Sequence, residues 1–172
     1  IGVVIPSVWL QEQMPALPDT AGEMLTKIIS TPGGYFVIAL LAPVVEEVVF
    51  RGAILRALLS SMQSKWGAIC ISAALFALIH FNPAQTPHAF LMGLLMGWLY
   101  MRTGSIVPGV VFHWANNTVA YLIAVAYPGD ETKLVDIFGG NETAVIMSVV
   151  FSLCIFIPAL FQLNIWTKKR GR

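Results

Sequence analysis

Charged side chains are scarce in this sequence. Asp, Glu, Lys and Arg make up 11% of its 172 residues, against about 25% in an average soluble domain. Hydrophobic residues reach 57%, and the mean hydropathy is +0.76. A soluble helical domain needs a charged outer face on its helices, and long stretches here have none. The scarcity excludes an ordinary soluble domain and favours lipid as the solvent.

A strong net charge is also missing. The formal net charge is +1, so the sequence lacks the electrostatic footprint of a nucleic-acid-binding protein. The basic residues are scattered, except for a cluster after the last apolar run that contains Lys168, Lys169, Arg170 and Arg172. Such a cluster is typical of the cytoplasmic flank of a membrane helix.

The sequence further lacks paired cysteines and internal repeats. Cys70 and Cys154 lie inside apolar runs, without the close spacing of a metal-ligand pair, and we interpret them as buried apolar side chains. No period of about 20 to 50 residues recurs. We therefore expect a single membrane domain over residues 1–172. We also expect an upstream segment, because the first residue lies in the middle of an apolar run.

Five apolar runs approach the roughly 20 residues that a membrane helix needs. They are Gly33 to Leu59, Trp66 to Phe81, His88 to Met101, Ser105 to Tyr127 and Thr143 to Trp166, with Ile1 to Leu10 as a remnant of another. A short amphipathic helix around Ala21 to Ile29 is expected along the membrane surface. The second and third runs are short for a full crossing, and broken helices at membrane depth need a protein-lined or water-filled cavity. The sequence predicts an all-α bundle of membrane-spanning helices, some short or broken, around a polar intramembrane cavity.

The basic residues give an orientation. Lys65, Arg102 and the terminal basic cluster are expected in the cytoplasm, because Lys and Arg near membrane helices favour that side. Alternating crossings then place the Gln11 to Thr31 segment outside, together with the Gly129 to Glu142 loop and its acidic residues Asp130, Glu131, Asp136 and Glu142. We expect an integral protein of a bacterial cytoplasmic membrane with its C-terminus in the cytoplasm.

Two carboxylates and a guanidinium interrupt the first apolar run, at Glu46, Glu47 and Arg51. A charge at the centre of a membrane helix costs about 2.5 to 3.5 kcal/mol on the mildest scale, so such groups face a protein interior or water. Glu47 and Arg51 are four residues apart and are expected to form an ion pair on one helical face. Glu46 points about 100° away from Glu47, which leaves its carboxylate available for another role.

Two further runs carry polar groups that suit hydrolysis. His80 ends the second run, and His113 and Asn117 share a face of the fourth because they are four residues apart. A carboxylate can deprotonate a water, while imidazole and amide groups can stabilise an oxyanion in a low-dielectric site. From these residues alone a proton path stays open as the alternative, although secondary transporters usually contain internal repeats.

The motifs of other protease classes are missing. There is no Gly-x-Ser-x-Gly nucleophile elbow, and Asp130 lacks a second Asp within an apolar run. The sequence therefore supports neither a serine nor an aspartyl site.

Other residues receive structural interpretations. His88, next to Pro87 at a helix start, is expected at the membrane interface, and Asn116 is expected to form hydrogen bonds between helices. Gly93 and Gly97, four residues apart, predict a close helix contact.

Three motifs, in order on separate apolar runs, carry a family resemblance. Glu-Glu-x-x-x-Arg corresponds to Glu46, Glu47 and Arg51, Phe-x-x-x-His to Phe76 and His80, and His-x-x-x-Asn to His113 and Asn117. On these motifs the chain resembles the CAAX protease and bacteriocin-processing family of intramembrane proteases, also called Abi or CPBP proteins.

The resemblance implies hydrolysis of a peptide bond within or at the membrane. It implies that Glu46 acts as a general base on a water, that His80 orients or shares the proton, and that His113 and Asn117 polarise the scissile carbonyl. Supporting roles fall to the helix-holding pair Glu47 and Arg51 and to Phe76.

Members of this family have been described both as metalloproteases and as enzymes in which glutamate itself activates the water. In the metal version, Glu46, His80 and His113 would ligate zinc or another divalent ion beside an open position. We favour a site without a cofactor, because Asn117 is a poor zinc ligand but a natural oxyanion donor. The sequence also has no His-Glu-x-x-His.

The expected partners are membrane lipid and a membrane-associated peptide or protein, lipidated or not, and no nucleic acid. The alternative function is that of a non-proteolytic family member, in an immunity or carrier-type role, which keeps the same scaffold. The sequence predicts no oligomeric state.

Overall fold

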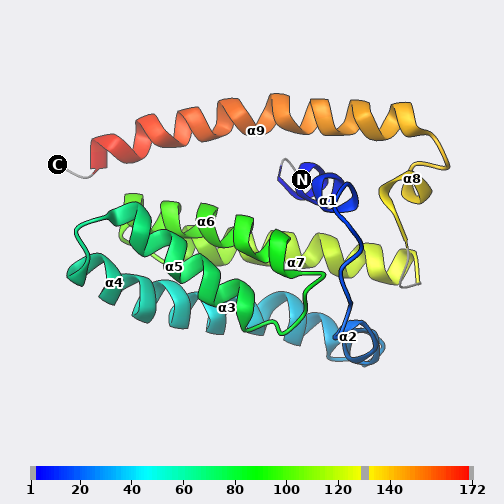
Figure 1. The fold of residues 1–172 in the computed structure, drawn as a ribbon, viewed down its shortest axis with the longest axis horizontal. Helices are drawn as coiled ribbons and strands as arrows, with labels where there is room; N and C mark the ends of the chain where they lie inside the picture. Colours follow the sequence, from blue (N-terminus) through cyan, green and yellow to red (C-terminus); the bar gives the residue numbers. More distant parts are fainter. Residues whose placement is uncertain (1–2, 129–131, 171–172) are drawn as a thin grey trace.

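The computed structural model describes residues 3–128 and 132–170, and this part of the chain is helical with no strand. The expected all-α class is confirmed. The elements, in chain order, are α1 (Val4–Glu12), α2 (Gly22–Ile29), η1 (Phe36–Leu41), α3 (Ala42–Glu47), η2 (Val48–Leu55), α4 (Arg56–Ser61), α5 (Lys65–Leu78), α6 (Thr86–Thr103), α7 (Val107–Ala126), α8 (Leu134–Ile137) and α9 (Glu142–Arg170) (Figure 1).

The predicted runs correspond to these elements with shifted ends. The first run forms four segments that follow one another from Phe36 to Ser61, two α-helical and two π-helical. The second run is the 14-residue α5, short as expected. The N-terminal remnant forms α1 and continues to Glu12. The short helix α8, which the sequence analysis did not predict, lies in the expected outer loop.

The short helix expected around Ala21 to Ile29 is present as α2, and its place at a membrane surface stays a prediction. Every residue of α2 is at least partly exposed, and Glu23 stands in its first turn. The helix therefore borders the bundle without entering its core.

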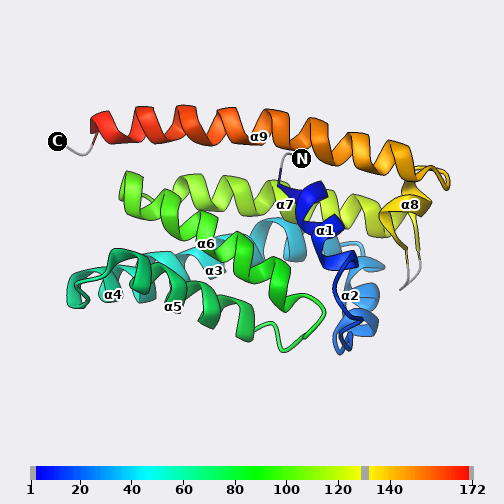
Figure 2. The same ribbon diagram turned by 45° about the horizontal axis from the view of Figure 1, so that its top comes forward.

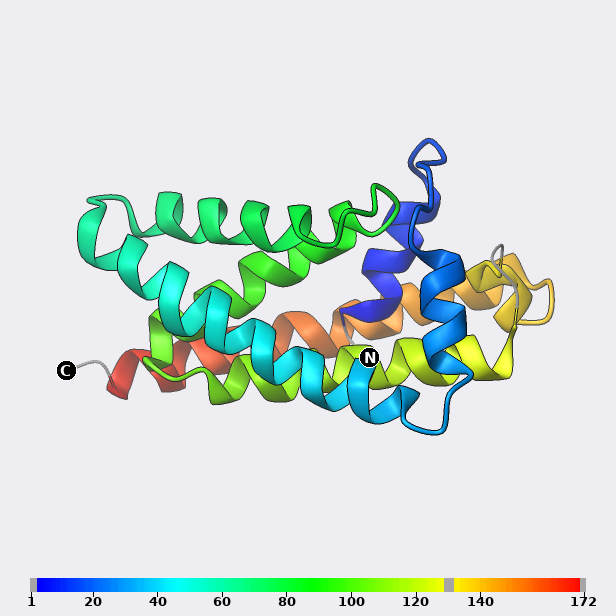
Figure 3. The same ribbon diagram turned by 90° about the horizontal axis from the view of Figure 1, so that it is seen from below.

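The helices lie side by side in a bundle with two distinct ends. Figures 1 and 2 show α2 and α8 at one end, and the α4–α5 connection and the C-terminus at the other; the view from below agrees (Figure 3). At the C-terminal end, the Arg102 guanidinium donates to Asn164 O at 2.6 Å and to Thr167 Oγ1 at 3.0 Å. At the opposite end, Leu134 N donates to Glu12 Oε1 at 2.7 Å.

The two groups of residues that were assigned to opposite sides of the membrane thus lie at opposite ends. Which end faces the cytoplasm stays a prediction. Asp130, Glu131 and Arg172 lie outside the described residues, as do the side chains of residues 168–170.

The distribution of apolar side chains is inverted relative to a soluble bundle. In α7 the buried residues are Gly109 and His113, whereas Val107, Leu122 and Val125 are exposed. Helix α9 exposes a similar apolar surface along its length. The interpretation of Cys70 and Cys154 as buried is wrong, because both are exposed on the apolar outer surfaces of α5 and α9. Among the described residues, α7 and residues 142–167 of α9 are long and apolar enough to cross a membrane, and α5 is a shorter apolar helix. An apolar exterior around polar interior groups fits lipid as the solvent.

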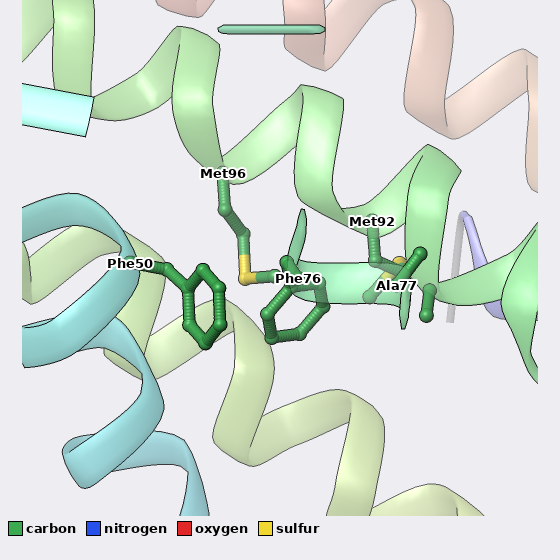
Figure 4. Packing of buried hydrophobic residues seen from close by; sticks show 6 residues of the cluster. Phe50, Phe76, Ala77, Met92 and Met96 are labelled. Atoms are coloured by element: carbon green, nitrogen blue, oxygen red, sulfur yellow. The ribbon is translucent and has the colours of Figure 1, made fainter. Parts of the chain in front are cut away.

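The core lies where η2, α5 and α6 meet. Its buried members are Phe50, Phe76, Ala77, Ala89, Met92 and Met96, and the rings of Phe50 and Phe76 stand edge to face with centroids 5.3 Å apart (Figure 4). Flexible methionine side chains fill the irregular space beside the two rings.

Helices α5 and α6 approach closely at glycine, as the sequence predicts. A Cβ at Gly93 would lie 2.9 Å from Cα and Cβ of Ala73, and one at Gly97 would lie 3.0 Å from Ile69 Cγ2. Small residues of this kind allow membrane helices to pack backbone to backbone.

The loop between α5 and α6 is fastened to the segment before α2. The buried Asn82 amide donates to Asp19 Oδ1 at 2.8 Å, and its Oδ1 accepts from Thr20 N at 3.3 Å. Thr20 Oγ1 donates to Phe81 O at 2.6 Å. Phe81 has a φ of +48°, which a bulky residue rarely adopts, so these contacts hold a strained turn directly after His80.

We expect Gly93→Ala to destabilise the fold, because the added methyl group collides with the backbone of α5. The expected loss is about 1 to 3 kcal/mol, as for other overpacked interiors, and a lower thermal unfolding midpoint in detergent measures it. Gly52→Ala is the matched control, since its Cβ would meet no atom nearer than 3.8 Å and alanine is favoured in helices. Equal midpoints for the two variants would contradict the packing argument.

Candidate active site

The helix that carries the two carboxylates has an irregular hydrogen-bond pattern just before them. The Ala42 N–H donates to Val37 O, five residues back, as in a π-helix. The next residue, Pro43, has no N–H to offer to Ile38 O. The Ile38 carbonyl instead accepts from Asn117 Nδ2 of α7 at 3.0 Å. Pro43 therefore frees a backbone acceptor that ties α7 to this helix.

Glu47 and Arg51 form the expected ion pair. Arg51 NH1 donates to Glu47 Oε1 at 2.6 Å, and the two side chains are 1% and 0% exposed. Arg51 NH2 donates to Gly93 O on α6 at 3.1 Å, and its guanidinium carbon lies 4.5 Å from the centroid of the Phe76 ring. The pair is thus held by groups from two other helices, α5 and α6.

The ring of His113 lies between the two carboxylates. His113 Nε2 is 3.6 Å from Glu46 Oε2, and Nδ1 is 3.5 Å from Glu47 Oε1. The expected partner of Glu46 in activating the water is His80. Among the described residues, however, the ion-pair contact of Glu46 is with His113. The reason is the crossing of α3 and α7, which places the imidazole against both carboxylates. The side chain of Glu46 is 23% exposed, so it is the more accessible of the two.

Gly109, four residues before His113, makes room for the buried carboxylate. A Cβ at Gly109 would collide with Glu47 Oε2. Gly109 was not among the predicted site residues, although its place one turn before His113 and directly after Pro108 is the signal that could have identified it.

Phe76 connects the second motif to the rest. Its ring stands edge to face with the rings of His80 and His113, at centroid distances of 5.1 and 5.6 Å. His80 Nδ1 lies 2.9 Å from Phe76 O. Because a carbonyl oxygen only accepts, Nδ1 carries the proton, and a neutral His80 presents Nε2 as an acceptor.

Asn117 lies one helical turn from His113, but its amide is held by other groups. Besides the bond to Ile38 O, its Oδ1 accepts from Asn116 Nδ2 at 3.2 Å. Asn116 Oδ1 lies 3.2 Å from His88 Nε2 on α6, so the predicted interhelical role of Asn116 is confirmed. His88, which was expected at the interface, has its ring between α7 and α1, where Nδ1 lies 3.0 Å from Ser7 Oγ.

The residues of the three motifs therefore lie together, but some of their buried polar atoms have no hydrogen-bond partner. The buried side-chain atoms without a hydrogen-bond partner in the described part are Glu46 Oε2, Glu47 Oε2, Arg51 Nε and His113 Nδ1. All four belong to the residues of the first and third motifs. Unsatisfied buried groups are rare in proteins and require a specific reason, of which catalysis is one.

The three candidate metal ligands are not gathered around one point in this arrangement. Glu46, His80 and His113 do not form a group of ligating side chains, nor does any other set of His, Cys, Asp and Glu among residues 3–128 and 132–170. The ring of Phe76 packs edge to face against both histidine rings, and each ring nitrogen of His113 faces a carboxylate.

We expect Glu47→Ala to lower the abundance of folded protein more than Arg51→Ala does. Truncation of one partner leaves the other charge buried and uncompensated. A stranded Glu47 can take up a proton, whereas a stranded Arg51 cannot lose one. Folded yield and unfolding temperature in detergent measure the difference. Parent-like stability of both variants would show that the two groups are solvated rather than paired.

One family of known proteins matches a large part of the chain. The family described as type II CAAX prenyl endopeptidase Rce1-like matches residues 29–119, which is more than half of the chain and includes all three motifs. No curated protein and no solved structure matches the chain. The match starts at the last residue of α2 and ends within α7. The chain belongs to the Rce1-like family of type II CAAX prenyl endopeptidases, a family of CAAX-type intramembrane proteases.

Proposed function

We propose that this protein is an intramembrane endopeptidase in which Glu46 and His80 activate a water and His113 and Asn117 stabilise the oxyanion. The observation that carries the proposal is the set of buried polar atoms without partners at Glu46, Glu47, Arg51 and His113, which lies within the region of the family match. Ionisable groups at membrane depth are costly and mark a functional site by default.

The two carboxylates take different roles because their surroundings differ. Glu47 is fully buried and its charge is matched by Arg51, so it orders the helix. Glu46 is partly exposed, and among the described residues its ion-pair contact is with His113 rather than with a Lys or Arg. It is therefore the carboxylate that a water reaches. In the proposed step, Glu46 takes a proton from the water as the oxygen bonds to the scissile carbonyl carbon.

The histidines and the amide then complete the reaction. The acceptor Nε2 of His80 shares the proton, which passes to the amine as the carbon–nitrogen bond breaks. The carbonyl oxygen gains negative charge in this step, and N–H groups of His113 and Asn117 stabilise it. The second N–H of the Asn117 amide suits this role, since its first N–H is committed to Ile38 O.

The proposed substrate is a membrane-associated peptide, and a prenylated CAAX peptide is the first to test because the matched family is described by that substrate. The residues around His80 suit an apolar substrate, as Leu78 and Phe81 are 61% and 86% exposed. The proposed location is a bacterial cytoplasmic membrane with the C-terminus in the cytoplasm, which the separation of basic and acidic ends supports.

We expect Glu46→Gln to abolish cleavage while the protein stays folded, because the amide keeps the size of the carboxylate but cannot accept the proton. Quantitative proteomics of membranes that contain parent or variant measures peptides cut at one defined bond. Glu23→Gln on the exposed face of α2 is the matched control and should cleave like the parent. Cleavage by folded Glu46→Gln at more than a few per cent of the parent rate would remove Glu46 from the base role.

We expect activity to survive prolonged incubation with a membrane-permeating chelator, because the donor atoms of Glu46, His80 and His113 do not form a ligand set. The metal content of the purified active enzyme, measured by mass spectrometry, accompanies the assay, since a buried ion exchanges slowly. Stoichiometric metal that is lost together with activity, and restores activity when added back, would assign these three residues as ligands.

A further inference from the structure

A chain of hydrogen bonds runs from the candidate site to the N-terminal helix. Its members, here called the amide–histidine chain, are Ile38 O, the side chains of Asn117 and Asn116, the ring of His88 and the hydroxyl of Ser7. They come from η1, α7, α6 and α1. Ser7 lies outside the matched residues 29–119.

The direction of this chain follows from its first member. A backbone carbonyl only accepts, so the atom of Asn117 at 3.0 Å from Ile38 O is the amide nitrogen. The Asn117 oxygen therefore faces Asn116 and needs a donor, which is the Asn116 amide nitrogen at 3.2 Å. The Asn116 oxygen is then turned to His88, so Nε2 of His88 donates to it across 3.2 Å.

The end of the amide–histidine chain at Ser7 agrees with this direction whether His88 is neutral or protonated. Ser7 has one hydroxyl proton and two acceptors in reach, Val4 O at 2.9 Å and His88 Nδ1 at 3.0 Å. If His88 is neutral, Ser7 donates to Nδ1; if it is charged, Nδ1 donates to Ser7 and the hydroxyl turns to Val4 O. In both cases Nε2 carries a proton toward Asn116.

We propose that His88 is a positioning residue for the peptidase reaction: through Asn116 it fixes the orientation of the Asn117 amide, and Ser7 on α1 completes its setting. The proposal rests on the proposed function, in which Asn117 stabilises the oxyanion. Without a donor at His88, the Asn116 amide loses the bond that orients it and can rotate. The Asn117 oxygen then loses its partner, and the amide no longer presents its nitrogen in one fixed position.

The test compares His88→Phe, which keeps a ring without donors, with His88→Gln, which keeps a donor toward Asn116. The assay is cleavage of a farnesylated CAAX peptide by the full chain in lipid nanodiscs. We expect His88→Phe to lower kcat about tenfold with KM unchanged, the size of effect for one lost hydrogen bond that orients a catalytic group. His88→Gln should stay within about threefold of the parent.

A double-mutant cycle separates positioning from a structural role. Asn117→Ala alone should lower kcat by about 10²-fold, as for other oxyanion donors. If His88 acts through Asn117, His88→Phe adds no further loss in the Asn117→Ala background. An equal additional loss in that background would overturn the proposal.

A second readout does not need activity. In nitrogen-15 spectra, parent His88 should show a protonated Nε2, and the Asn117 side-chain amide should exchange its protons at least about tenfold faster in His88→Phe. Ser7→Ala should accelerate this exchange, and Ser148→Ala, the matched control, should not. Like Ser7, Ser148 donates to a carbonyl three residues back, but among the described residues it forms no hydrogen bond to a histidine. An unprotonated Nε2, or exchange that is insensitive to His88, would overturn the proposal.

If the parent cleaves no peptide, the proposed function fails, and these spectra alone decide whether His88 orients Asn117.

Discussion

The buried charge of Glu47 is the constraint on which the site depends. A carboxylate in a lipid-solvated bundle requires a cation, and Arg51 is the choice that cannot lose its proton. The pair draws in the Gly93 carbonyl and the face of Phe76, and it needs the space above Gly109. Such pairs contribute little net stability once desolvation is counted. Their effect here is to fix how η2, α5, α6 and α7 meet.

With Glu47 neutralised by Arg51, Glu46 is the carboxylate available for the proposed chemistry. Glu46 differs from Glu47 by one position in sequence, but it is partly exposed and faces His113 rather than a guanidinium. Two adjacent residues of the same type thus receive different surroundings from the helix geometry, and their different proposed roles rest on this difference. The apolar packing of Phe50, Phe76 and the α6 methionines adjoins the fully buried Glu47–Arg51 pair, where a low dielectric strengthens the attraction between the two charges.

The sequence predicted what depends on spacing along one helix. The Glu47–Arg51 pair and the close contact at Gly93 and Gly97 follow from intervals of four residues. It did not predict what depends on the crossing of two helices, such as the position of His113 between both carboxylates or the ring of His88 between α1 and α7. The π-helical segments were also missed, because hydropathy does not distinguish backbone hydrogen bonds that span four residues from those that span five. Pro43 carried a signal for the free Ile38 carbonyl, but the partner of that carbonyl lies 79 residues away.

The π-helical segment η1 has a consequence for insertions and deletions. A π-helical loop holds one residue more than an α-helical loop, so loss of one residue within η1 can be absorbed by a return to α-helical bonding. The register of Glu46, Glu47 and Arg51 against α7 would then survive. The regular α-helical turns of α7 contain no extra residue that could be lost. A one-residue deletion between His113 and Asn117 would therefore rotate one side chain relative to the other by about 100°. The two helices that build the site therefore tolerate length changes to very different degrees.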